Sequence, residues 1–277
     1  MDDQLVQAIK NKNVILFVGA GVSANLGLPT WNDLISHMAE KLGYDPEVYK
    51  TLGDNLSLAE YYIKEMGSIG QLRSWMDREW HKSTIKIEES EIHQLIVQLG
   101  FPIIYTTNYD RWIEMAFEHY NNEFLTIKNV GDLKNVKEGI TQIVKFHGDF
   151  EDDSSIVLTE SSYFERFDFE SPLDIKLRAD ILGKTILFIG YSLSDINIRF
   201  LLYKLNKTWQ NSTYSSDRPK SYIFFPRPNP IQEKVLGERG IKSLTLNDDN
   251  PASSLKTFLE NLLYEAHGIK IEEDTKK

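Results

Sequence analysis

Residues 14–29, VILFVGAGVSANLGLP, decide the fold of this chain. The first five residues form a continuous apolar run rich in β-branched and aromatic side chains, which is typical of a strand buried inside a parallel sheet. The glycine-rich turn that follows leads directly into a helical pattern. A buried strand, a tight turn and a helix in this order predict an α/β protein.

Strand and helix patterns alternate along most of the remaining chain. Further strands are expected at 101–108, 124–128, 142–148, 185–192, 221–226 and 241–246. Helices are expected at 4–10, 109–120, 171–182 and 252–267. This alternation predicts a Rossmann-like, mostly parallel sheet with helices on both faces.

Residues 32–98 interrupt the alternation with aromatic-rich helical patterns and no convincing strand. We interpret them as a helical insertion in a single domain spanning 1–277, whose Rossmann-like core covers about 1–31 and 99–268. The aromatic side chains around 58–80 offer a contact surface, but such stripes usually face inward, which favours core packing.

The composition excludes several kinds of site. The chain has 277 residues, a formal net charge of −10 and no cysteine, so disulfides, thiolate zinc sites and a cysteine nucleophile cannot form. Its acidity disfavours direct binding to nucleic-acid phosphates. The N-terminus lacks a signal-peptide pattern, and the apolar runs are far shorter than the roughly 20 residues that span a bilayer. We therefore expect a cytoplasmic protein without membrane contact.

The glycine turn fits a dinucleotide-binding pattern. Gly19, Gly21 and Ala24 match G-x-G-x-x-G/A directly after a strand, where backbone amides can approach a pyrophosphate. The alternative is a tight turn that binds nothing. An ordinary dehydrogenase is disfavoured, because the acid expected about 20 residues later on a second strand falls in a helical region instead.

Three more polar motifs follow predicted strands: TTNYD at 106–110, FHGD at 146–149 and GYSLSD at 190–195. Ligands bind beyond the carboxyl ends of such strands, so we expect the four motifs to share one site. His147 can act as a general base there. The five other histidines fall in predicted helices: His37, His81, His93, His119 and His267.

Each of these motifs also has a purely structural interpretation. Asn108 or Asp110 would cap the helix that follows the second motif, and Ser194 or Asp195 would cap the one after the fourth. His147 would then be a histidine hydrogen-bonded within its turn.

Taken in order, the four motifs resemble those of the sirtuin family. GAGVSANLGLPTW is similar to the family loop GAGxSxxSGIPxFR, TTNYD to TQNID, His147–Gly148 to the catalytic His-Gly pair, and GYS to GTS. The resemblance spans about residues 14–246. It implies an NAD pocket bordered by Gly19, Ala20, Gly21, Ser23, Pro29, Trp31, Thr107, Gly190, Tyr191 and Ser192.

The departures from the family pattern suggest which reaction to expect. Thr107 replaces the family Gln, Thr-Trp-Asn at 30–32 replaces Phe-Arg, and the four-cysteine zinc module of protein-deacylating sirtuins cannot form. These features resemble the sirtuin-like domains of bacterial anti-phage systems. The implied activity is NAD glycohydrolysis, with NAD as the substrate, no metal, and nicotinamide and ADP-ribose as products.

The resemblance also implies roles for individual residues. Asn108 would position the water or the nicotinamide ribose, His147 would act as the base, and Asp110 would stabilise the nicotinamide end. The phosphates would rest on amides around Ala20 and Gly21.

Restraint of such an enzyme implies a homo-oligomer, or a partner such as a HerA-type ATPase or an Argonaute-like protein. Two alternatives are a non-catalytic regulatory subunit that binds NAD or ADP-ribose and a zinc-free NAD-dependent protein deacylase. A nucleic-acid enzyme would need a carboxylate–metal cluster, and the acidic run at 151–153 fits a solvated loop better.

Overall fold

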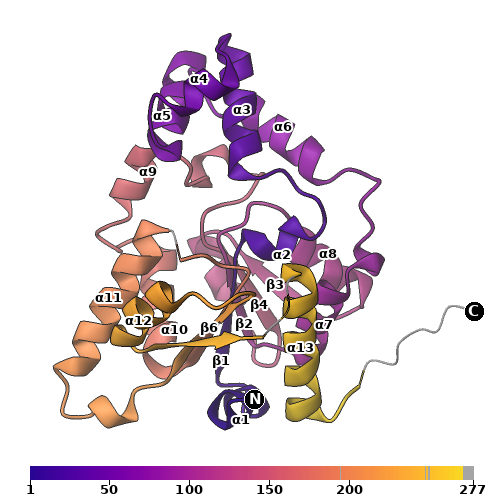
Figure 1. Ribbon diagram of the computed structural model, residues 1–277, viewed down its shortest axis with the longest axis vertical. Coiled ribbons are helices and arrows are strands. Elements are labelled where there is room, and N and C mark those ends of the chain that lie inside the picture. Colours follow the sequence, from indigo (N-terminus) through magenta and orange to yellow (C-terminus); the bar gives the residue numbers. More distant parts are fainter. Residues whose placement is uncertain (194, 247, 249, 271–277) are drawn as a thin grey trace, which may run out of the picture.

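The computed structural model describes residues 1–193, 195–246, 248 and 250–270. Within them lies one sheet in the order β3-β4-β2-β1-β5-β6-β7, in which every neighbouring pair is parallel (Figure 1). The strands are β1 (Val14–Val18), β2 (Ile103–Thr106), β3 (Phe124–Ile127), β4 (Thr141–Lys145), β5 (Thr185–Ile189), β6 (Ser221–Phe225) and β7 (Ile241–Thr245). The predicted Rossmann-like parallel sheet is confirmed, with each strand at its expected place.

Strand β1 lies in the middle of the sheet, and all five of its residues are buried. Leu16 belongs to the apolar cluster on one face, whereas Phe17 belongs to the cluster on the other. Successive side chains of a strand point to opposite faces. The continuous apolar run is therefore explained by a strand that is covered on both sides.

Helices supply the apolar clusters on the two faces (Figure 1). One cluster includes residues of α1 (Asp3–Lys10), α7 (Glu91–Leu99), α8 (Trp112–His119) and α13 (Pro251–His267). The other includes residues of α10 (Pro172–Gly183), α11 (Ile196–Gln210) and α12 (Pro230–Glu238). None of the helices within the described residues has the length and apolar character needed to cross a bilayer.

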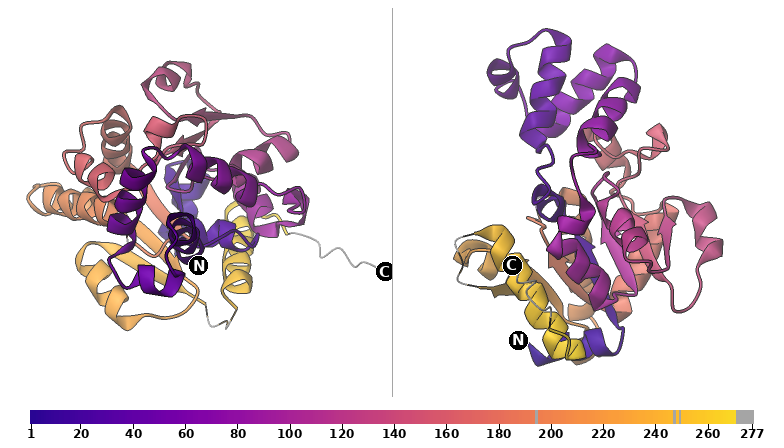
Figure 2. Two further views of the ribbon diagram at one scale, coloured as in Figure 1. Left: turned by 90° about the horizontal axis from the view of Figure 1, so that it is seen from above. Right: turned by 90° about the vertical axis from the view of Figure 1, so that its right-hand side faces the viewer.

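The helical insertion stands beyond the carboxyl ends of the strands (Figures 1 and 2). It contains α3 (Trp31–Leu42), α4 (Pro46–Lys50), α5 (Asn55–Met66) and α6 (Gly70–Trp80). Its aromatic stripe is largely core, since Tyr62 and Trp80 are buried, although Tyr61 remains 39% exposed. Helix α7, at the end of the predicted insertion, instead packs along α13.

The insertion is joined to the core after β4. Arg73 pairs with Asp153 at 2.8 Å, and the amide of Ser161 donates to Glu60 at 3.1 Å. Ser161 lies in the short helix α9 (Glu160–Glu165). The insertion therefore contacts the segment that follows His147.

Candidate active site

The four polar motifs follow β1, β2, β4 and β5, which are neighbours in the order β4-β2-β1-β5. After β1, the strands β2, β3 and β4 lie on one side of β1, and β5, β6 and β7 lie on the other side. Such a reversal at the carboxyl ends of the strands is where open α/β sheets bind ligands. The topology brings the predicted motifs to one place.

Asn108 links the second motif to the first. Its side-chain Nδ2 donates to the Gly19 carbonyl at 3.2 Å and to the Ser23 hydroxyl at 3.1 Å. A backbone carbonyl can only accept, so this contact fixes the orientation of the amide. Asn108 is only 8% exposed, and its Oδ1 is the remaining polar atom of the amide, which can only accept.

Backbone hydrogen bonds link the first motif to the fourth. Gly19 N donates to Ile189 O at 3.0 Å, and Gly21 N donates to Gly190 O at 2.8 Å. A Cβ atom on Gly19 would overlap the Gly190 carbonyl, and Gly190 itself has a φ of +57°. The glycines therefore allow two turns to pack against each other.

This packing changes what the glycine turn offers a ligand. The sequence predicted that amides around Ala20 and Gly21 would hold phosphates, but the Gly21 amide is committed to Gly190. Ala20 is exposed, and within the described part of the chain its amide has no hydrogen-bond partner. The Ala20 amide is therefore the donor that this turn leaves unpaired.

His147 lies in the turn after β4 and is 2% exposed. Gly148 has a φ of +93°, and a Cβ atom there would overlap the Ser155 carbonyl, so the turn requires glycine. The His147 ring packs edge-on against Tyr163 with centroids 5.3 Å apart. Burial lowers the pKa of His147 from 6.5 to about 4, although Asp195 opposes the shift. The ring is therefore neutral at pH 7.

Asp195 is a site residue that the sequence reasoning did not assign. Its Oδ2 lies 3.2 Å from His147 Nε2, while its Oδ1 accepts from Ile198 N at 3.0 Å and caps α11. The predicted capping role is confirmed for Asp195; Ser194 lies outside the described residues. In the sequence, this residue could have been found as the carboxylate that ends the motif GYSLSD at 190–195.

Asp110 stabilises the turn that begins α8. Its Oδ1 accepts from Trp112 N at 3.2 Å, and its backbone carbonyl accepts from Lys145 Nζ. The N-cap of α8 is Arg111, not Asp110 as the capping interpretation predicted. Lys145 is fully buried, and its Nζ lies 3.3 Å from Glu114 Oε1. The contact of Asp110 with nicotinamide stays a prediction.

The helical insertion also braces the second motif. His81, at the end of α6, accepts from Arg111 N at 3.0 Å through Nε2, and its Nδ1 lies 2.8 Å from Asp77 Oδ1. Trp112 Nε1 donates to the Trp80 carbonyl at 2.9 Å. His81 had been predicted as an ordinary helical histidine, and no sequence pattern indicated this contact.

The remaining residues predicted to border the NAD pocket differ in solvent exposure. Pro29 and Thr107 are half-buried and Ser192 is exposed, whereas Trp31 begins α3 and packs against the core. The Tyr191 ring is buried against Phe17 with centroids 5.2 Å apart, so it contributes to the core. Among the residues that the structure describes, no group of three His, Asp or Glu side chains is arranged to hold a metal ion.

Two buried histidines predict acid sensitivity. Burial lowers the pKa of both His93 and His147 to about 4, so the unfolded chain binds protons near pH 6.5 that the folded chain does not. The free energy of unfolding should fall as the pH drops from 6.5 toward 4, by roughly 2 kcal/mol per histidine at pH 5.

Urea denaturation of the wild type, His93→Gln and the exposed control His119→Gln at pH 7, 6 and 5 measures this effect. On acidification, His93→Gln should lose less free energy of unfolding than the wild type does. The control His119→Gln should lose as much as the wild type. Equal stability of the wild type at pH 7 and 5 would contradict the prediction.

The SIR2-like domain family matches residues 102–244, slightly more than half of the chain. The NAD(+) hydrolase ThsA of Bacillus cereus (strain MSX-D12) is 29% identical over 275 residues, covering 91% of this chain and 55% of that protein. ThsA of Enterococcus faecium is 35% identical over 201 residues, covering 71% and 40%. Defense-associated sirtuin 2 of Bacillus subtilis is 29% identical over 279 residues, covering 93% and 26%.

Two solved structures share the fold. A Sir2 homologue in complex with NAD superposes with a TM-score of 0.51 at 15% identity, covering 97% of this chain and 94% of that one. A mutant Sir2 homologue in complex with 2′-O-acetyl ADP ribose gives a TM-score of 0.53 at 14% identity, covering 98% and 100%. This chain spans about half the length, or less, of the curated relatives above. The predicted sirtuin resemblance is confirmed: the chain belongs to the SIR2-like domain family.

Proposed function

We propose that this protein is an NAD glycohydrolase that cleaves NAD to nicotinamide and ADP-ribose and depletes NAD in anti-phage defence. The observation that carries the proposal is the orientation of Asn108, whose amide nitrogen is fixed by Gly19 and Ser23 while its Oδ1 is left to accept. The names of the relatives, NAD(+) hydrolase and defense-associated sirtuin, support the same reaction and setting.

In the proposed reaction, the bond between the nicotinamide nitrogen and ribose C1′ breaks, and nicotinamide leaves with the bonding electron pair. The oxygen of a water molecule bonds to C1′, while Asn108 Oδ1 accepts a hydrogen bond that orients this water. Neutral His147 takes the water proton, directly or through a ribose hydroxyl. Because the pKa of His147 is about 4, the protonated ring then releases this proton to solvent at neutral pH.

The rest of the site would bind and orient NAD. The Ala20 amide would donate to a phosphate, and Asp110 would stabilise the nicotinamide end. The half-buried Thr107 and the exposed Ser192 would contact the ribose rings. Water is the proposed acceptor because a chain without cysteine lacks the zinc module of deacylating sirtuins.

NAD hydrolysis must be kept inactive in a healthy cell. We assign this control to self-association of the chain or to a HerA-type ATPase partner in the cytoplasm. A hollow between the loop after α9, α11 and the end of α12 supports an assembly surface. It is lined by Phe167, Phe200 and the exposed side chains of Ile196 and Tyr203.

The substitution His147→Ala separates catalysis from binding. We expect NAD cleavage to fall by roughly a hundredfold or more, because a general base contributes on that order, while NAD still binds in calorimetry. The control His119→Ala changes an exposed histidine of α8 and should retain activity.

Two outcomes would contradict the role of His147. Equal cleavage by wild type and His147→Ala would remove it from the mechanism. Tight NAD binding by the wild type without turnover would instead establish the non-catalytic regulatory subunit.

A further inference from the structure

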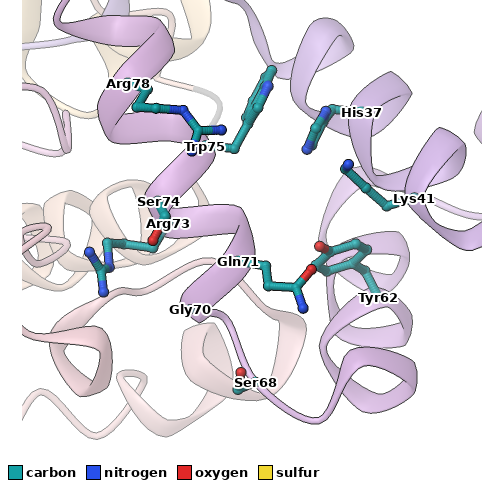
Figure 3. Close-up of a pocket in the computed structure, with 10 residues that line it drawn as sticks. All are labelled: His37, Lys41, Tyr62, Ser68, Gly70, Gln71, Arg73, Ser74, Trp75 and Arg78. Carbon is teal, nitrogen blue, oxygen red and sulfur yellow. The ribbon is translucent and has the colours of Figure 1, made fainter.

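A cavity lies inside the helical insertion, away from the four motifs. It has a volume of about 610 Å³ and lies between α3, α5 and α6 (Figure 3). His37 and Trp75 form one wall as a stacked pair, with centroids 3.8 Å apart and planes 10° apart. Ligand pockets for small molecules have volumes of this order.

The charge of this cavity is opposite to that of the protein. Its lining includes Lys41, Arg73 and Arg78 but no carboxylate, although the chain carries a net charge of −10. Arg73 pairs with Asp153 and points away from Lys41 (Figure 3). Within the described residues, Lys41 and Arg78 form no ion pair with a carboxylate. Two cations are therefore available for an anion.

An unpartnered hydroxyl group also points into the cavity. Tyr62 is fully buried, and its hydroxyl has no hydrogen-bond partner among the described residues. Figure 3 shows this hydroxyl directed from α5 toward Gln71 of α6, below the ammonium of Lys41. Buried polar groups in folded proteins nearly always have partners. An oxygen of a ligand in the cavity would give the Tyr62 hydroxyl a hydrogen-bond partner.

We propose that this cavity binds a small organic phosphate at a site separate from the proposed NAD site. Lys41 and Arg78 neutralise the phosphate, and Tyr62 and Gln71 donate hydrogen bonds to its oxygens. A phosphate presents several acceptor oxygens to donors of this kind. The body of the molecule lies along the wall formed by Trp75, because the volume exceeds that of a bare anion.

Indole N–H signals in NMR spectra test the proposal at single-residue resolution. The chain has five tryptophans, and the Trp75 signal is assigned with Trp75→Phe. ADP, added to the full chain, should shift the Trp75 signal in a saturable manner. Lys41→Gln and Tyr62→Phe should each weaken this apparent affinity at least fivefold. The control Lys64→Gln, an exposed lysine of α5 outside the cavity, should leave it unchanged.

Three results would overturn the proposal. ADP could shift the Trp31 signal near the glycine turn without shifting that of Trp75, or the affinity reported by Trp75 could be equal in all variants. Citrate could bind as tightly as ADP, which would show that charge rather than phosphate is recognised. Because the readout is binding at Trp75, a failure of NAD hydrolysis would not affect it.

Discussion

Asn108→Ala is expected to lower kcat for NAD cleavage by roughly 10²- to 10³-fold, the scale on which positioning of a reactant acts. The substitution removes the acceptor that would orient the attacking water. It also removes the contacts of Nδ2 with Gly19 and Ser23, which join the first two motifs. Binding of the adenosine end of NAD should persist, because the contacts proposed for that end do not involve Asn108.

Nicotinamide release, measured by chromatography under saturating NAD, tests this expectation. Asn122→Ala is a matched control, because Asn122 is exposed in the loop after α8. The control should retain wild-type turnover, and circular dichroism should show that both variants are folded. If Asn108→Ala cleaved NAD at the wild-type rate, Asn108 would have no role in positioning the water.

Lys145→Met is expected to lower the free energy of unfolding by about 3–5 kcal/mol, the cost of leaving a buried charge unpaired. Lys145 is fully buried on β4 between Glu114 and the Asp110 carbonyl. Removing the ammonium leaves Glu114 uncompensated, and neither of its carboxylate oxygens has a hydrogen-bond partner in the part of the chain that the structure describes.

A double substitution separates stability from function. Lys145→Met with Glu114→Leu should recover most of the lost stability in urea denaturation, since an apolar pair can replace a buried ion pair. Both Lys145→Met and the double variant should cleave NAD more slowly than the wild type, because in each the Asp110 carbonyl lacks its donor. Lys176→Met, which breaks the more exposed pair with Asp180, should cost about 1 kcal/mol or less. A double variant no more stable than Lys145→Met would contradict this account.

The central sheet could be predicted because its strands are covered on both faces. β1, β5 and β6 are buried along their entire length, and apart from Thr185 and Ser221 at the start of β5 and β6 their sequences are apolar. The boundaries differ from those predicted: β2 covers 103–106 rather than 101–108, because residues 107–108 leave the sheet for the turn that carries Asn108. Helix α12 was not predicted, although Asn229 and Pro230 carry a typical helix start.

The candidate site was predictable where its residues directly follow strands, as Asn108 and His147 do. The residues that brace it were not, because their contacts depend on how distant segments pack. Arg111 and His81 are 30 positions apart, and Lys145 reads in the sequence as an ordinary strand residue. Asp195 reaches His147 from the loop after β5, which lies beyond β2 and β1 in the sheet.

The most direct test of the proposed function is the identity of the products when purified protein is given NAD with and without an acetylated peptide. We predict nicotinamide and ADP-ribose in equal amounts, unchanged by the peptide. Formation of 2′-O-acetyl ADP ribose only when the peptide is present would identify a zinc-free deacylase. Absence of nicotinamide release under both conditions, even with a partner ATPase added, would contradict NAD hydrolysis altogether.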